Sequence, residues 1–224
     1  MMICPETFYD ENLKGKNERE ILSVIRKLKQ EIGRLKNVME DSDYVKTVCP
    51  GEDVQISCNR MYLERAKQAL AEVGGTYTPS HAEMRAEKIN ANLPYIFKVE
   101  FCINAFSIGC EEKTYFVDGD KVTTTTDRTS YKSPSEPLDF EDEEMDKDTL
   151  ISGLADLHIG EWRSEYAPHH FDFSISDSVS WNLNIYFSNG HRPVKIDGCN
   201  AYPYNFQRLL ELFNIQLFSM ADLK

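Results

Sequence analysis

The stretch LADLHIGEW, residues 154–162, contains the residues whose types and spacing most directly suggest chemistry. Asp156, His158 and Gly160 form the pattern D-x-H-x-G, and a carboxylate and an imidazole can both ligate a divalent metal ion. Two-metal phosphoesterases open their sites with this pattern and use the cations to stabilise displacement at phosphorus. The stretch therefore raises the hypothesis of a metal-dependent hydrolase.

Further candidate ligands lie in the stretch HHFD, residues 169–172. In an extended segment, His170 and Asp172 share one face and His169 points to the other. A metal site needs additional ligands, but no Gly-Asp pair follows, and the stretch SNGHRP separates its Asn from its His by a glycine. We keep the hydrolase as the alternative hypothesis, with the candidate ligands Asp156, His158, His169, His170 and Asp172.

The element expected around the opening stretch argues against a shared metal. The sequence DTLISGLADLHI has apolar residues at helical spacing, and on a helix Asp156 and His158 diverge by about 200°. We expect a helix that turns at Gly160 into a segment anchored by Trp162. No nucleophile elbow and no glycine-rich phosphate loop is present. The sequence therefore predicts no metal, no cofactor and no catalytic residue.

Two tryptophans suggest a second kind of site. Each lies beside alternating apolar residues, in GEWRSEY and SWNLNIYF, which is typical of side chains that anchor a core. An aromatic-floored groove for a small ligand is the alternative that the sequence leaves open. The candidate groove residues are Trp162, Arg163, Tyr166, Trp181 and Tyr202.

Charge suggests a third surface. The formal net charge is −12, and residues 136–148 hold eight acids and one lysine, a local charge of −7. This distribution argues against direct binding of nucleic acid, which requires clustered Lys and Arg. The segment is either a solvated loop or a docking strip for a basic protein. The candidate strip residues are Asp139, Glu141, Asp142, Glu143, Glu144 and Asp146.

The first 93 residues are predicted to form a helical region. Asn17 and Glu20 have the spacing of a capping box, Asn59 is the expected cap of a second helix, and Ser80 begins a third. Apolar residues of the first helix follow a heptad pattern, which predicts either packing on a neighbouring helix or self-association as a coiled coil. The expected helices are about 18–41, 60–73 and 80–91. The heptad residues are Ile21, Ile25, Leu28, Ile32, Leu35 and Met39.

Residues 94–224 are predicted to form an α+β domain. The stretch YIFKVEFCINAF alternates like a strand, and Asp-Gly and Asn-Gly pairs mark two hairpins. An acidic loop is expected at about 128–148, and a closing helix with Pro203 in its first turn. The predicted fold class is α+β: a helical N-terminal part, then a mainly antiparallel β-sheet with a packed C-terminal helix.

The chain has no apolar run of the roughly 20 residues that cross a bilayer, so no membrane partner is expected. Its start lacks the basic and apolar regions of a signal peptide. The six cysteines form no C-x-x-C pair and are expected to be reduced thiols. These features predict a cytoplasmic protein.

Most of the chain resembles a known family. The stretches LHIGEWR (157–163) and WNLNIYFSNGHRPVKIDGCNAYPYNFQRLLELF (181–213) carry the distinctive residues, and the N-terminal YLERAKQALAEVGGTYTPS supports them. Together they resemble an uncharacterised protein family of gut Firmicutes. The resemblance implies a small α+β module with LHIGEWR at a structural junction, and it implies no activity. The family's D-G-T-Q-W stretch is DSVSW (177–181) here, so no binding role is carried over for that turn.

The leading hypothesis is a non-enzymatic cytoplasmic interaction protein, associated with mobile genetic elements. Its expected partner is a protein with a basic surface, bound through the acidic strip, or a second copy, bound through the heptad residues. The motivation is the placement of charge, the heptad pattern and the incompleteness of every catalytic set in the sequence.

Overall fold

The computed structural model describes residues 3–41, 44–45, 49–131, 144–167 and 178–218. The chain divides into two compact units, Met1–Ser80 and His81–Lys224. The division falls one helix earlier than the expected boundary after residue 93, so the third predicted helix belongs with the sheet. No helix in the described ranges is long and apolar enough to cross a membrane.

The first unit is built from three helices, α1 (Pro5–Asn12), α2 (Glu18–Met39) and α3 (Glu52–Glu72). The predicted capping box begins α2: the Asn17 side chain accepts from the Glu20 backbone N–H at 3.1 Å, and Glu20 accepts from that of Asn17 at 3.0 Å. Five of the six predicted heptad residues lie on the side of α2 that is buried in this unit, with exposed fractions of 1–8%. These heptad residues are Ile21, Ile25, Leu28, Ile32 and Leu35, whereas Met39 is half-buried.

The second helix starts earlier than the sequence suggested. Gly51 is its N-terminal cap, and Asn59, which we expected to cap the helix, lies inside α3. Two acids in the first turn, Glu52 and Asp53, favour this start because they face the positive end of the helix dipole. Helix α1 was not predicted; its Phe8 ring stacks on that of Tyr62 at 4.4 Å between ring centroids.

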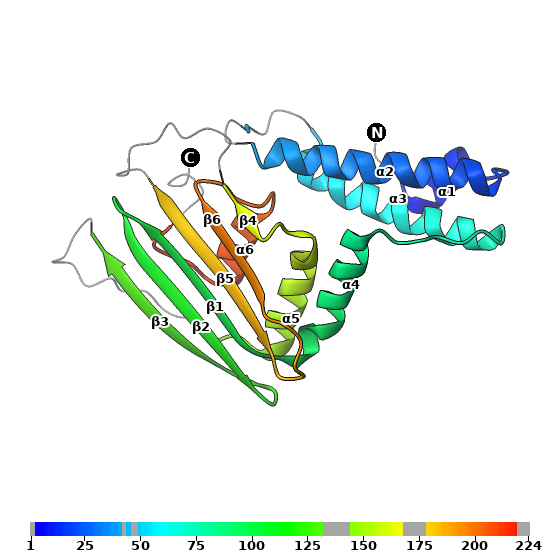
Figure 1. Cartoon of the computed structure of the whole chain (residues 1–224). Coiled ribbons are helices and arrows are strands. Elements are labelled where there is room, and N and C mark those ends of the chain that lie inside the picture. Colours follow the sequence, from blue (N-terminus) through cyan, green and yellow to red (C-terminus); the bar gives the residue numbers. More distant parts are fainter. Residues whose placement is uncertain (1–2, 42–43, 46–48, 132–143, 168–177, 219–224) are drawn as a thin grey trace. The chain divides into compact units, whose positions relative to one another are not determined.

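The second unit contains a six-stranded sheet in the order β3-β2-β1-β5-β6-β4. Neighbouring strands are antiparallel except β4 and β6, which are parallel. The helices of this unit that the structure describes lie on one face of the sheet (Figure 1). The strands are β1 (Ile96–Ala105), β2 (Gly109–Asp118), β3 (Lys121–Ser130), β4 (Glu165–Tyr166), β5 (Val179–Phe187) and β6 (Val194–Cys199). The helices are α4 (His81–Asn92), α5 (Lys147–Asp156) and α6 (Phe206–Leu212).

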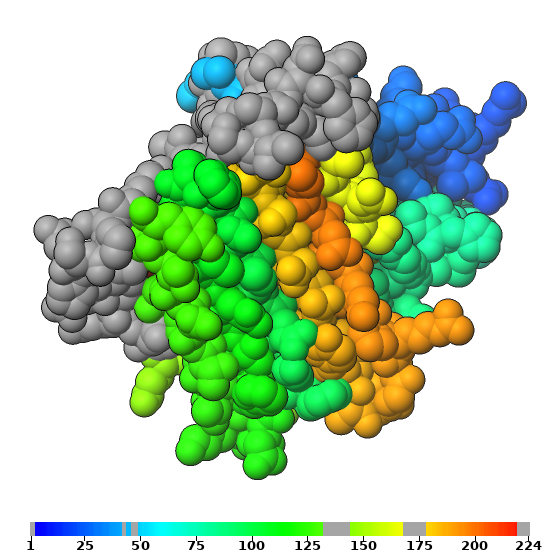
Figure 2. Space-filling model, turned by 60° about the vertical axis from the view of Figure 1, so that its left-hand side comes forward, coloured from blue at the N-terminus to red at the C-terminus, as the bar shows by residue number. Residues whose placement is uncertain are grey.

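Alternation along the strands gives the sheet two different faces. In β1, Val99, Phe101 and Ile103 are fully buried toward the helices, whereas the residues between them are partly exposed. Leu154 of α5 and Phe213, just after α6, belong to the same hydrophobic cluster. The opposite face, which we call the open face, is covered by no helix of this unit in the described ranges. Figure 2 shows the strands side by side on that surface.

The α+β class is confirmed, with local differences. The hairpin between β2 and β3 turns at Gly119, whose φ of 61° suits glycine. The closing helix is shorter than expected: Pro203 precedes it, and its backbone carbonyl accepts from the Phe206 N–H at 2.9 Å. The short strand β4 was not predicted. Residues 132–143 of the expected acidic loop lie outside the described residues.

Candidate functional site

The predicted metal ligands are not brought together by the described structure. The expected helix is present, but α5 ends at Asp156, and the chain turns at His158, whose φ is 51°, rather than at Gly160. A Cβ on Gly160 would lie 2.6 Å from the Cα of Ala86 in α4, so this glycine permits close packing instead. The stretch 169–172 lies outside the described residues. Among the residues that are described, no three His, Cys, Asp or Glu side chains could hold a metal ion.

The two tryptophans meet inside the second unit. Trp162 and Trp181 are each 2% exposed, and their rings meet edge-on at 6.5 Å. Trp181 also packs on Tyr166 at 5.7 Å and on Phe206 at 4.7 Å, and its indole N–H donates to the Ala201 carbonyl at 3.0 Å. Both tryptophans are therefore anchors of the hydrophobic core, as their sequence context indicated.

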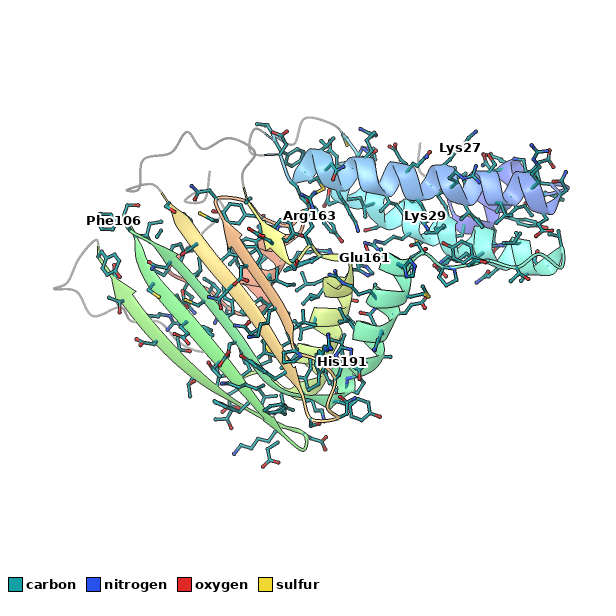
Figure 3. The ribbon with its side chains drawn as sticks, in the orientation of Figure 1. Lys27, Lys29, Phe106, Glu161, Arg163 and His191 are labelled. Carbon is teal, nitrogen blue, oxygen red and sulfur yellow. The ribbon has the colours of Figure 1, made fainter. Side chains whose placement is uncertain are left out.

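The remaining groove candidates surround this cluster. The Tyr202 ring packs on Phe206 at 4.9 Å, and burial raises the pKa of the Tyr202 hydroxyl above its ordinary value. Arg163 is exposed, with its guanidinium carbon 5.7 Å from the centre of the Tyr166 ring (Figure 3). The structure thus brings the five predicted residues to one region. Trp162, Trp181 and Tyr166 are at most 4% exposed, so in this structure they do not line an exposed groove.

Little of the predicted acidic strip is described. Asp139, Glu141, Asp142 and Glu143 lie outside the described residues, and Glu144 is exposed. Asp146 has a structural role: its carboxylate caps α5 by accepting from the Thr149 backbone N–H at 2.7 Å. Hydrogen bonds from Thr149 lower the pKa of the Asp146 carboxyl.

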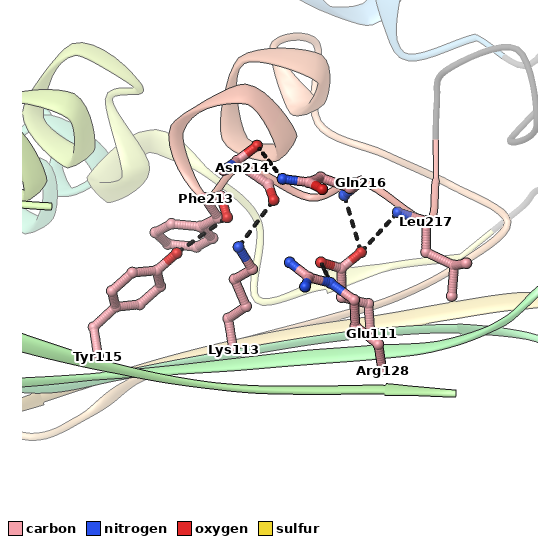
Figure 4. Close-up of polar contacts among 8 residues, drawn as sticks. All are labelled: Glu111, Lys113, Tyr115, Arg128, Phe213, Asn214, Gln216 and Leu217. Atoms are coloured by element: carbon pink, nitrogen blue, oxygen red, sulfur yellow. Dashed lines mark hydrogen bonds and ion pairs between the residues drawn. The ribbon is translucent and has the colours of Figure 1, made fainter. Parts of the chain in front are cut away.

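A buried group of charged side chains was missed by the sequence analysis. Glu111 and Lys113 are 0% and 2% exposed and point from β2 toward the helices. The Glu111 carboxylate accepts from the Arg128 guanidinium of β3 at 2.7 Å. Its other oxygen accepts from two backbone N–H groups, those of Gln216 at 3.0 Å and Leu217 at 2.9 Å (Figure 4).

This group fastens the segment that follows α6, residues 213–217, to the sheet. The Lys113 ammonium donates to the Asn214 carbonyl at 2.9 Å, and the Tyr115 hydroxyl donates to the Phe213 carbonyl at 3.1 Å. Glu111, Lys113 and Tyr115 alternate along β2 and therefore point to the same face of the sheet. Together they bind the backbone of residues 213–217, which lie about a hundred positions later in the chain. Because each Glu111 oxygen accepts a hydrogen bond and the site is buried, the arrangement suits structure rather than catalysis.

The open face carries an exposed aromatic group at one end. Phe97 and Phe116 are 43% and 44% exposed, and the Phe97 ring lies 6.2 Å from that of Tyr186. The Lys98 ammonium lies 5.4 Å from the Phe116 ring centre and 5.5 Å from that of Tyr186, within cation–π range. Lys98 also pairs with Glu100, which is the principal cause of the lowered pKa of that carboxyl. We call Phe97, Lys98, Phe116 and Tyr186 the aromatic group.

Beyond Glu100, a row of polar residues crosses five strands of the same face. Each residue of the row lies opposite the next one on the neighbouring strand. The row runs from β3 to β6 through Asp127, Glu112, Cys102, Asn182 and Asp197. The three carboxylates are exposed, and none forms an ion pair in the part of the chain that the structure describes. At about 4.8 Å per strand, the row is about 19 Å long. We call Asp127, Glu112 and Asp197 the acidic row.

The row contains one thiol of a close pair. The sulfurs of Cys102 and Cys110 are 3.9 Å apart, and both side chains are half-buried. Burial and the neighbouring thiol raise the pKa of Cys102 to about 12, and burial also raises that of Cys110. These thiols therefore stay protonated near neutral pH, which opposes a nucleophilic role.

The fold and these surfaces define an α+β protein with one packed sheet face and one open, acidic sheet face. Comparison of the chain with family models, with curated proteins and with solved structures gives no match. The resemblance to a family of gut Firmicutes therefore stays a prediction.

Proposed function

We propose that this chain is a non-enzymatic cytoplasmic interaction protein whose open sheet face binds a basic protein segment. The observation that carries the proposal is the acidic row, three exposed carboxylates without ion pairs among the described residues, on the same face as an exposed aromatic group. Lys and Arg side chains of a partner would meet the carboxylates, and its apolar side chains would cover the rings. Aromatic side chains are frequent anchors of protein interfaces.

Two other surfaces were proposed from the sequence, the acidic strip and the heptad residues, and only the strip would support binding at the open face. The acidic strip would add to its negative potential and strengthen long-range attraction of a basic partner. Self-association through the heptad residues would require α2 to separate from its own unit, since Ile21, Ile25 and Leu35 are at most 2% exposed. The association with mobile genetic elements and the family membership remain part of the proposal.

Binding of a defined basic peptide tests the proposal. The probe is a fluorescent decapeptide that alternates arginine and leucine, with fluorescence anisotropy as the readout. The test variant neutralises the acidic row through Glu112→Gln, Asp127→Asn and Asp197→Asn. Three exposed pairs at about 0.2–1 kcal/mol each predict roughly tenfold weaker binding.

A matched control separates local recognition from attraction by net charge. The variant Glu11→Gln, Glu87→Gln, Asp156→Asn removes the same charge from exposed positions off the row. We expect its affinity for the peptide to stay within twofold of the original. Equal losses in the two variants would show that only net charge matters, and absence of binding by the original protein would refute the proposal.

A further inference from the structure

One side of the β3 backbone has no partner strand in the part of the chain that the structure describes. Strand β3 is an outer strand of the sheet and pairs only with β2 among the described strands. In an antiparallel pair, alternate residues direct their N–H and C=O groups away from the neighbour. β3 has ten residues, none of them proline or glycine, and includes four consecutive threonines. Such an edge is a template for a further strand.

The charges on this edge indicate what that further strand is. Lys121 and Asp127 are exposed, lie on the open face and form no ion pair within the described residues. Thr124 lies midway between Lys121 and Asp127 in the sequence. If two copies of β3 pair antiparallel around their Thr124 residues, Lys121 of each lies opposite Asp127 of the other, and Thr123 lies opposite Thr125. Opposite charges and threonine pairs both stabilise antiparallel neighbours.

Neighbouring registers lose this match. A shift of two residues places Lys121 opposite Thr125 or Thr129, so the lysine and the aspartate no longer meet. A shift of one residue places Lys121 opposite Thr126 or opposite Arg128, a like charge, and turns the open faces of the two sheets to opposite sides. Among these registers, pairing centred on Thr124 is the one that satisfies the charges, and it is two-fold symmetric, as most homodimers are.

We propose that β3 is a self-complementary edge through which two copies of this chain join their sheets, in the register set by Lys121 and Asp127. The open faces then lie on the same side and form one continuous surface, on which Lys121 of each copy pairs with Asp127 of the other while Glu112 and Asp197 of both rows stay exposed. This inference does not depend on the proposed binding of a basic partner, because dimerisation is measured on the protein alone.

Charge exchange across the edge tests the inference. Sedimentation and light scattering measure the dissociation constant of the original chain, of Lys121→Asp, of Asp127→Lys and of the double variant. Each single change creates two like-charge pairs per dimer, and we expect it to weaken dimerisation at least tenfold. The double variant restores both pairs in reversed order and should dimerise like the original. Circular dichroism verifies that every variant is folded.

Mixing the two single variants gives a stricter test. In a mixed dimer, the aspartate introduced at position 121 of one variant meets the lysine introduced at position 127 of the other. The second pair, between the original lysine and the original aspartate, is also complementary, so two weakly associating proteins should form a heterodimer. Lys88→Asp in α4, an exposed position away from β3, is the control and should leave dimerisation unchanged. An original chain that is monomeric at every concentration tested, or a dimer indifferent to these charges, would overturn the inference.

Discussion

Glu111→Gln should destabilise the second unit strongly, although the two side chains have almost the same size. Glu111 is fully buried, and its oxygens accept from Arg128, Gln216 and Leu217. A glutamine has one acceptor oxygen and one N–H₂ group, so it must direct a donor toward groups that are themselves donors. Arg128, whose side chain is only 11% exposed, would also lose its anionic partner.

The size of the effect follows from the number of interactions lost. Removing one member of a buried ion pair costs about 3–5 kcal/mol, because the other charge stays buried without compensation. The two backbone hydrogen bonds to a charged acceptor are worth about 1.5–3 kcal/mol each, and they are lost as part of the same event. We therefore expect a decrease of about 3–5 kcal/mol in the free energy of unfolding, not the sum of these contributions.

Urea unfolding followed by tryptophan fluorescence measures this loss, because both tryptophans lie in the core of the same unit. The matched control is Glu112→Gln, the next residue on β2, whose side chain is exposed on the other face. It should change stability by less than about 0.5 kcal/mol. If Glu111→Gln costs no more than this control, the buried charge does not hold the segment 213–217, and the reasoning is refuted.

Two further predictions concern the core and the paired thiols. Gly198→Ala places a Cβ 2.1 Å from the Trp181 indole nitrogen, so overpacking should lower the free energy of unfolding, measured by thermal unfolding, by about 1–3 kcal/mol. The control is Gly33→Ala, whose Cβ would have no atom within 4 Å, and it should not destabilise the first unit. The pKa of Cys102 is about 12 in the folded chain and near 9.0 when exposed. The unfolded chain therefore releases this proton first, and stability should fall between about pH 9 and pH 12. Cys102→Ser should flatten that dependence in unfolding experiments, and an unchanged slope would contradict the assignment.

Local sequence signals predicted much of the fold but little of the surface that carries the proposals. The capping box of α2, the alternation of β1 and the glycine turn at Gly119 depend on neighbours within a few residues, and these predictions are confirmed. The start of α3 was misplaced because Asn59 has the side chain typical of a cap, whereas the helix begins after Gly51, which offers no side chain to cap it.

The aromatic residues show where sequence reasoning stops. Trp162 and Trp181 were correctly expected as anchors, yet nothing local indicates that they touch each other or that Gly198 must lack a side chain to admit Trp181. These contacts join segments that the chain brings together only when the strands pair.

The sequence by itself determined the α+β class, the amphipathic helix α2 and the acidic balance. Only the tertiary structure decided which of the adjacent acids Glu111 and Glu112 is buried, because moving a strand's register by one residue exchanges its faces. That register depends on pairing with β1 and on a segment more than a hundred residues away. The register of β2 therefore places Glu111 in the buried charged group and Glu112 in the acidic row on the open face.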